Sequence, residues 1–485
     1  MAELIASTPP SLITANLSLS NQHISVMFFQ GVITFLLLGI TVSQAFPWTV
    51  SCFWTNSFNS TDPGVDLCNH VIFDPGDKVR LEQSTLSVRA DDFTQTSGYK
   101  NLMRFKERHP KVKLELLIGS FATKKVLYDI AAKPQNFITA VRNFLKCLRF
   151  DGIHLMWGSP NKDAYEYFLT PQNATKQRKI LSAFLMELKL AKVSFSFGIR
   201  GVLEIDCNME VNKVYETADL VLLYAYAYHG AWEETTGAFS PLHAREESSE
   251  RVNYFYMTVE STWESLEVSG GVPEKTILVV SAKSSAFKLR DPASHGIAAG
   301  SDRRKFKKED NTRPDFKEVC RMLLDKNRAG KWSIVWDDVG KQSYTYSGDT
   351  WISYEDVCSV IEKKNYARDM KFAGMALKDL SRDDQRGDCV ERTLPENADP
   401  HMVDNLKGTF PLLRIIAEIQ KQTNPCSKIL LKSDGGKTPI FVVAFMLGPF
   451  QMFLLYLPIP SNSFDFRPFN CSTSARAGID TSRES

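Results

Sequence analysis

Residues 150–160 read Phe-Asp-Gly-Ile-His-Leu-Met-Trp-Gly-Ser-Pro, and they form the most informative stretch of the chain. Two sets of side chains alternate along it, Ile153, Leu155 and Trp157 against His154, Met156 and Gly158. A period of two is typical of a β-strand, because successive side chains point to opposite sides. The stretch therefore predicts a strand with one apolar face that packs under helices and a different second face.

Similar short strands alternate with amphipathic helices through the middle of the chain. The predicted strands begin near Val50, Cys68, Leu114, Gly152, Val193, Leu220, Thr276 and Phe372. One of the helices carries an apolar stripe at three- and four-residue steps, made of Phe137, Val141, Phe144, Leu145 and Leu148. Repeated strand–helix units predict the α/β class and a (β/α)8 TIM barrel, whose functional residues lie at the C-terminal ends of the strands.

The strand at 150–160 resembles the signature strand of the family 18 glycoside hydrolases, the chitinases and chitinase-like lectins. The family pattern is D-G-x-D-x-D-W-E-Y-P, and the matching residues are Asp151, Gly152, Trp157 and Pro160. His154, Met156 and Gly158 stand at the remaining acidic positions. The resemblance implies that Gly158 replaces the proton-donating Glu, and that Met156 replaces the Asp that orients the N-acetyl group of the substrate.

Both replacements remove chemistry that the family reaction needs. A positioned general acid contributes about 10²–10⁴-fold in rate, and family 18 enzymes combine it with attack by the N-acetyl oxygen of the substrate. Glycine has no proton to donate, and methionine has no charge. We therefore predict a pseudoenzyme without catalytic residues, in which His154 is a lumen histidine hydrogen-bonded to its neighbours; the alternative is a catalytic or metal-binding His154. No metal or cofactor is expected, because no Cys/His/Asp cluster lies at ligand spacing around His154.

Two further stretches resemble sugar-binding strands of the family. Residues 223–232 resemble M-x-Y-D-F-H-G-x-W, in which Tyr226 matches the tyrosine that hydrogen-bonds the N-acetyl group and Ala227 replaces an Asp. Residues 372–378 resemble the last barrel strand, in which Lys378 replaces the tryptophan floor of the subsite. Such a lysine implies poor affinity for neutral sugars and would suit an acidic ligand. The ligand contacts that the resemblance implies are Tyr226, Trp232, Phe121 and Lys378.

The residues around Tyr226 allow two further predictions. Tyr224, Tyr226 and Tyr228 alternate with alanines, so the three rings are expected to share one face, where they stack on a sugar or fill the lumen. Glu233 and Glu234 follow Trp232. We expect both to be exposed loop carboxylates rather than replacement acids.

Roughly 90 residues separate the seventh and eighth predicted strands, which is too long for a loop in a compact domain. They resemble the small α+β insertion of the family. The predicted organisation is an N-terminal extension with a signal peptide at 1–45, a barrel at 46–285 and 371–422, the insertion at 286–370 and a tail at 423–485.

Residues Met27–Ala45 contain an apolar core and end in a small-x-small cleavage site, which predicts secretion. Nine cysteines fit an oxidising compartment. The resemblance implies disulfides between Cys52 and Cys68 and between Cys320 and Cys389. Cys147 is expected to be a buried thiol, and the cysteines without an assigned partner are Cys207, Cys358, Cys426 and Cys471. Asn59 and Asn173 begin glycosylation sequons.

Charge and hydropathy bear on the partners. A net charge of +2 gives no support for nucleic-acid binding. The run 303–308, Arg-Arg-Lys-Phe-Lys-Lys, is either a solvated face or a patch for sulfated polysaccharide. Residues 439–460 are uncharged and mostly apolar, long enough to span a bilayer. They are either a membrane anchor or part of a non-native tail.

The leading hypothesis is a secreted chitinase-like protein without hydrolytic activity. It would bind chitin or other N-acetylglucosamine-type glycans weakly, or a protein receptor, through the barrel cleft. Sugar binding can survive loss of the acid, because stacking on a ring and proton transfer are separate interactions. Two alternatives stay open: an active chitin-degrading hydrolase with a displaced carboxylate, and a growth-factor-like signalling protein with no sugar ligand.

Overall fold

The computed structural model describes residues 48–58, 63–76, 79–82, 85–88, 94–119, 124–157, 171–200, 209–245, 257–325, 332–389 and 408–418. Several predicted features lie outside these ranges. They are the signal peptide, the tail 423–485 with its apolar segment 439–460, Asn59, Phe121, Gly158, Cys207, Cys426 and Cys471. Among the helices that the structure describes, none is both long and apolar enough to cross a bilayer.

Parallel strands close into a barrel in the order β1-β14-β9-β8-β7-β6-β5-β2. Their bounds are β1 Thr49–Thr55, β2 His70–Asp74, β5 Lys113–Ile118, β6 Gly152–Met156, β7 Phe195–Arg200, β8 Leu220–Tyr224, β9 Thr276–Ser281 and β14 Gly374–Lys378. Each predicted strand start lies within two residues of an observed one. The prediction of a TIM barrel is therefore confirmed.

The two faces of β6 pack as its alternation predicts. Ile153, Leu155 and Trp157 lie in the main core, between the strands and the helices. Met156 instead belongs to a second apolar cluster inside the barrel, which we call the lumen cluster. Its buried members are Phe53, Ile72, Leu117, Met156, Leu222, Tyr224, Ile277, Val279, Ala373 and Ala376.

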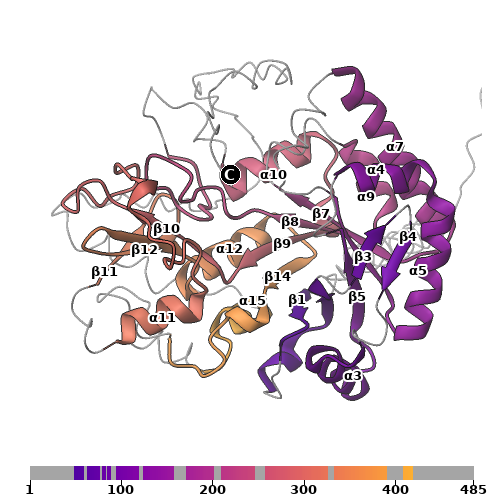
Figure 1. The fold of residues 1–485 in the computed structure, drawn as a ribbon, viewed down its shortest axis with the longest axis horizontal. Helices are drawn as coiled ribbons and strands as arrows, with labels where there is room; N and C mark the ends of the chain where they lie inside the picture. Colours follow the sequence, from indigo (N-terminus) through magenta and orange to yellow (C-terminus); the bar gives the residue numbers. More distant parts are fainter. Residues whose placement is uncertain are drawn as a thin grey trace, which may run out of the picture. The chain divides into compact units, whose positions relative to one another are not determined.

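Helices cover the outer face of the strands, and Figure 1 shows α3, α5 and α7 outside them. The helix bounds are α3 Ser97–Arg108, α4 Lys124–Ala132, α5 Pro134–Leu148, α7 Pro171–Leu190, α9 Val211–Thr217, α10 Val259–Val268, α11 Phe316–Leu324, α12 Val357–Asp369 and α15 Pro411–Ala417. Short 3-10 helices are η1 Pro63–Leu67, η4 Pro273–Lys275, η5 Arg303–Lys305 and η6 Leu380–Arg382.

The apolar stripe predicted within α5 packs on the main core. Phe137, Val141 and Leu148 are buried, and Phe144 and Leu145 are partly buried against them. The prediction that Cys147 is buried is wrong, because this free thiol is exposed. At about 100° per residue, position 147 points away from the stripe even though its sequence neighbours are apolar.

A four-stranded antiparallel sheet lies between β9 and β14 in the sequence, in the order β10-β13-β12-β11. Its strands are β10 Ser284–Lys288, β11 Ser333–Asp337, β12 Gln342–Ser347 and β13 Thr350–Tyr354. A separate hairpin is formed by β3 Val79–Glu82 and β4 Thr85–Val88. The sheet falls almost entirely within the predicted insertion. The last helix of that segment, α12, has buried residues in the main core of the barrel.

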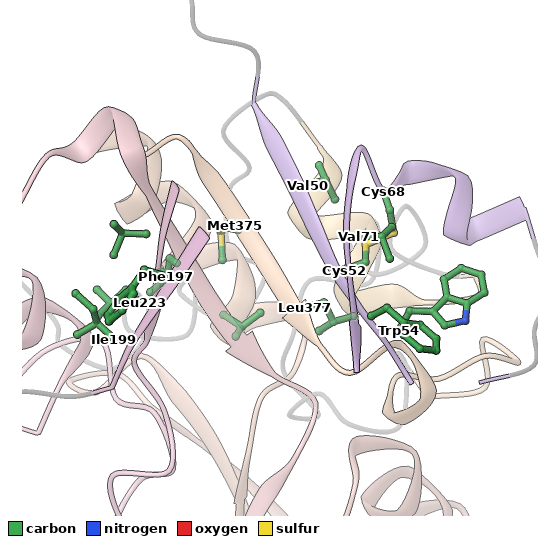
Figure 2. Packing of buried hydrophobic residues seen from close by; sticks show 14 of the residues in the cluster. Val50, Cys52, Trp54, Cys68, Val71, Phe197, Ile199, Leu223, Met375 and Leu377 are labelled. Atoms are coloured by element: carbon green, nitrogen blue, oxygen red, sulfur yellow. A yellow bond between two sulfur atoms is a disulfide. The ribbon is translucent and has the colours of Figure 1, made fainter. Parts of the chain in front are cut away.

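Both disulfides that the resemblance implies are present. Cys52 of β1 is bonded to Cys68, just before β2, and Figure 2 shows this bridge beside the apolar residues of β1. Cys320 of α11 is bonded to Cys389, with a sequence separation of 69. Cys358, for which no partner was assigned, is also disulfide-bonded.

Candidate functional site

The His154 side chain points into the barrel lumen and is held at both ring nitrogens. Nδ1 lies 2.7 Å from Ser196 Oγ on β7, and Nε2 lies 2.8 Å from the Tyr224 hydroxyl on β8. Burial lowers the pKa of His154 to about 3, although the Glu115 carboxylate opposes this shift. His154 is therefore a neutral, hydrogen-bonded lumen residue at neutral pH.

Below His154, a buried glutamate joins several strands through polar contacts. Glu115 of β5 accepts a hydrogen bond from Ser196, lies 3.2 Å from His70 Nε2 and lies 3.0 Å from Lys113 Nζ. His70 Nδ1 in turn lies 2.8 Å from Ser51 Oγ on β1. Burial alone would raise the pKa of Glu115, but its contacts with His70, Lys113 and Ser196 lower the pKa to about 2. Glu115 is thus an ionised structural group rather than a proton donor.

Met156 fills the lumen at the position where the resemblance places the orienting Asp. Gly198 on the neighbouring strand β7 makes room for it, because a Cβ there would lie 2.5 Å from Met156 Sδ and 2.9 Å from the Tyr224 ring. Met156 is almost completely buried, with 1% of its surface exposed. The described part of β6 therefore brings an imidazole and a thioether into the lumen, and no carboxylate.

The three tyrosines after Leu223 do not share one face, so that prediction is wrong. β8 ends at Tyr224, and Ala227 adopts a positive φ of 57°, which breaks the alternation. Tyr224 and Tyr226 pack at the lumen cluster, with ring centroids 5.9 Å apart. Tyr228 turns outward, and its hydroxyl donates to the Thr258 carbonyl oxygen at 3.0 Å. Only Tyr226 of the three is left as a candidate contact at the mouth of the barrel.

Tyr226 is half-buried and lies against the ring of Phe239, with centroids 5.9 Å apart and an interplanar angle of 27°. Burial raises the pKa of its hydroxyl, so the group is protonated and can donate a hydrogen bond. Within the described part of the chain this hydroxyl has no hydrogen-bond partner. It is therefore available to a ligand.

Lys378 ends β14 and extends over the lumen cluster. Its ammonium lies 4.6 Å from the ring centroid of Phe53 and 5.3 Å from that of Tyr224. Burial lowers the pKa of Lys378, whereas the nearby carboxylates Asp379 and Asp74 oppose this shift. Lys378 thus places a partly desolvated cation where the resemblance implies a flat aromatic floor.

Trp232 lies apart from the lumen cluster, on the loop after β8. It is 49% exposed, and the Arg313 guanidinium lies 5.2 Å from its ring centroid. The ring packs directly on Gly230, where a Cβ would come within 2.1 Å of it. The structure therefore places Trp232 beside Arg313, whose charge also acts on Tyr226.

The two carboxylates after Trp232 differ from each other. Glu234 is exposed as predicted, with Arg290 at 3.3 Å. The same prediction is wrong for Glu233, whose side chain is only 15% exposed and lies 3.0 Å from His229 Nδ1. Folding of the loop onto His229 partly buries Glu233, and residue type alone does not indicate this contact.

Two carboxylates that the sequence motifs do not indicate, Asp74 and Asp379, lie at the C-terminal ends of strands. Asp74 ends β2; burial raises its pKa, opposed by Lys378 and by a hydrogen bond from the Gly76 amide. Asp379 follows β14 and accepts a hydrogen bond from Arg382 Nε at 2.6 Å, while its Oδ1 is buried without a hydrogen-bond partner. Charged residues directly after a barrel strand are the signal that could have indicated both.

Among the described residues, one group has its side chains close enough to hold a metal ion: Cys320, Asp384 and Cys389. Its two sulfurs are joined in a disulfide, so this group offers no thiolate ligand.

Comparison with known proteins places this geometry in a family. The model of the glycosyl hydrolases family 18 matches residues 49–383. Chitotriosidase-1 of Mus musculus is 26% identical over 376 residues, which cover 74% of each chain. This chain spans 16% of the length of one curated relative and 91% of the length of another.

Solved structures agree on the fold. A Group IV chitinase of Ostrinia furnacalis has a TM-score of 0.64 and 23% identity, covering 76% of this chain and 98% of that one. Human YKL-39, described as a pseudo-chitinase with retained chitooligosaccharide binding properties, has a TM-score of 0.59 and 20% identity, with coverages of 76% and 98%. The family match extends over more than half of the sequence and contains all the strands of the barrel. This chain therefore belongs to family 18 of the glycosyl hydrolases.

Proposed function

We propose that this protein is a family 18 member without chitin-hydrolase activity that binds N-acetylglucosamine-containing glycans weakly at the mouth of its barrel. One observation carries the proposal: β6 offers the lumen His154 and Met156 and no carboxylate. A neutral imidazole held by two hydroxyl groups and a buried thioether can neither orient an N-acetyl group by charge nor protonate a leaving oxygen. The next position on that face of the sequence is Gly158.

Retained binding is supported by Tyr226. Its ring is half-buried, and its protonated hydroxyl is available to an N-acetyl oxygen. The YKL-39 structure supports the same combination in a relative, since its description joins pseudo-chitinase status with chitooligosaccharide binding. We expect the affinity to be low, because Lys378 presents a charge where a flat ring would stack on a sugar.

The second candidate is a hydrolase with a displaced acid, and Asp74 is the observation in its favour. A catalytic acid needs a raised pKa, and burial raises the pKa of Asp74. Asp379 is less suited to this role, because Arg382 binds one of its oxygens. A protein receptor, as in a growth-factor-like role without a sugar ligand, is the third candidate.

The test measures turnover and binding on the same purified full-length protein. We expect no release of fluorophore from a 4-methylumbelliferyl chitotrioside, and measurable binding of chitotetraose by titration calorimetry. Tyr226→Phe should weaken that binding by about twofold to tenfold, because one hydrogen bond contributes about 0.5–1.5 kcal/mol. The substitution should fold normally, since the Tyr226 hydroxyl has no described internal partner.

Tyr228→Phe is the matched control. It removes a hydroxyl that bonds Thr258 and Thr262, so it should lower stability slightly and leave chitotetraose binding unchanged. Turnover that Asp74→Asn abolishes would replace the proposal with the displaced-acid hydrolase. Absence of both turnover and binding would favour the protein receptor.

We also propose that the protein is exported. Its disulfides Cys52–Cys68 and Cys320–Cys389 are typical of proteins in oxidising compartments. The predicted signal peptide at Met27–Ala45 agrees with this. Mass spectrometry of the protein from expressing cells should show a mature N-terminus near Phe46, and an intact N-terminus on cytosolic protein would contradict export.

A further inference from the structure

Three basic residues lie on neighbouring segments at one side of the barrel mouth. Lys378 ends β14, and Lys283 follows the neighbouring strand β9, whose exit is tied to β14 by the Ala282 amide donating to the Lys378 carbonyl oxygen at 2.8 Å. Lys283 also forms an isolated β-bridge with Asp315, which brings the segment containing Arg313 to the same place. The charges of Lys283 and Arg313 are close enough to act on each other.

The carboxylates on this side of the mouth are bound by another cation. Arg382 donates to Asp379 Oδ2 at 2.6 Å and also to Asp315 Oδ1. Lys283, Arg313 and Lys378 form no ion pair with a carboxylate in the part of the chain that the structure describes. Asp74 faces Lys378 from β2, but burial disfavours its charged form. With Arg382 there are four cations here against the three carboxylates Asp74, Asp315 and Asp379, so positive charge is in excess beside Tyr226, where Arg313 also acts.

The Lys378 ammonium is the second reason to expect a ligand here. It lies over two aromatic rings, and burial destabilises its charged form. Among the described residues it has no hydrogen-bond acceptor. An anion beside it would replace the hydration that burial removes, and the attraction between the two charges would be stronger in the low dielectric of the lumen.

Trp232, next to Arg313, offers an aromatic ring on which a sugar can stack. The Arg313 guanidinium lies on Trp232, whose ring is half-exposed. Tryptophan faces stack on sugars, and a guanidinium forms paired hydrogen bonds with carboxylate or sulfate groups. A charged sugar would use both groups at once.

We infer that the barrel mouth prefers an anionic glycan, in which Lys378, Lys283 and Arg313 bind a carboxylate or sulfate group carried by an N-acetylglucosamine-containing chain. This inference rests on the proposed function and specifies its ligand class. It assigns the anion to the mouth rather than to the basic run 303–308. In that run Arg304 is bound by Asp302, and Lys305 donates to the Leu289 carbonyl oxygen.

The test compares tetrasaccharides on the purified full-length protein at 50 and 500 mM NaCl. The probes are neutral chitotetraose, its 6-O-sulfated form and a hyaluronan tetrasaccharide, which carries carboxylates only. At least one anionic probe should bind about fivefold or more tightly than chitotetraose at low salt, and the gap should narrow at high salt. The two anionic probes separate sulfate from carboxylate recognition.

Lys378→Met and Arg313→Gln should each lower the ratio of anionic to neutral affinity by about threefold or more. Arg313 is exposed, so its variant tests the inference even if Lys378→Met folds poorly. Lys308→Gln, in the basic run, is the charge-matched control and should leave the ratio unchanged. Equal affinity for neutral and anionic probes would overturn the inference and leave the proposed function standing. If Lys308→Gln lowers the ratio of anionic to neutral affinity instead, the anion site lies in the basic run. Absence of binding of any probe would reject both proposals.

Discussion

Replacing His154 with Gln should make the free energy of unfolding less sensitive to acid, by about 1.4 kcal/mol for every pH unit between about pH 6 and pH 4. His154 has a pKa of about 3 in the folded protein and an ordinary value of 6.5. Between these values the unfolded chain binds one proton more than the folded chain. Stability therefore falls as the pH falls, by up to about 5 kcal/mol over the whole window.

Other buried groups titrate in the same range with the opposite sign. Burial raises the pKa of Asp356 to about 6 and that of Asp383 to about 7, so the folded state holds these protons more tightly and gains stability as the pH falls. The contribution of His154 is therefore measured as a difference. Urea unfolding of the native protein and of His154→Gln at several pH values should give two curves that converge toward acid.

His243→Gln provides the control for this series. His243 is 37% exposed and pairs with Glu260 at the surface, where an ion pair contributes about 0–1 kcal/mol, so this substitution should change the free energy of unfolding only slightly. Parallel curves for the native protein and His154→Gln would mean that His154 is charged in the folded protein. In that case the lumen would hold a charged imidazole in acid, in place of the neutral imidazole described above.

Glu115→Gln should lower the free energy of unfolding at pH 7 by about 3 kcal/mol. The change removes the ionised carboxylate that binds His70, Lys113 and Ser196 in a completely buried position. The lowered pKa, about 2 against an ordinary 4.5, means that ionisation of Glu115 favours the folded state. Chemical denaturation followed by tryptophan fluorescence measures the loss.

The pH dependence of this loss is a second check. The folded pKa of Glu115 is lowered, so its contribution is complete above about pH 4.5 and disappears as the pH falls toward 2. The difference between native protein and Glu115→Gln should therefore shrink in acid. Glu267→Gln, on the exposed face of α10, should change stability by less than about 0.5 kcal/mol. Equal small effects of both substitutions would show that the lumen contacts of Glu115 contribute no stability.

The sequence predicts this barrel well because strand alternation and helical stripes are local patterns. The strand at 152–156 and the stripe on α5 follow directly from their periods. The same patterns do not identify partners across the barrel. Glu115 stands within an apolar strand, and nothing local indicates that His70 and Ser196 meet it from two other strands.

The candidate site is less predictable than the fold, since it depends on where each strand stops. The positive φ at Ala227 directs Tyr228 away from the mouth, although the sequence alternates up to that point. Asp74 and Asp379 contribute through their positions at strand ends rather than through a motif. The roles assigned to Tyr226, Trp232, Phe121 and Lys378 stay predictions until binding is measured.

The close packing of Met156 against Gly198 also bears on what a substitution at position 156 would do. A carboxylate introduced at position 156 alone would enter an apolar cluster, and a buried charge without partners is strongly unfavourable. Its neighbour His154 already uses both nitrogens, so it could not help without breaking existing bonds. A single substitution at position 156 is therefore expected to destabilise the lumen cluster rather than to supply the orienting carboxylate of the family.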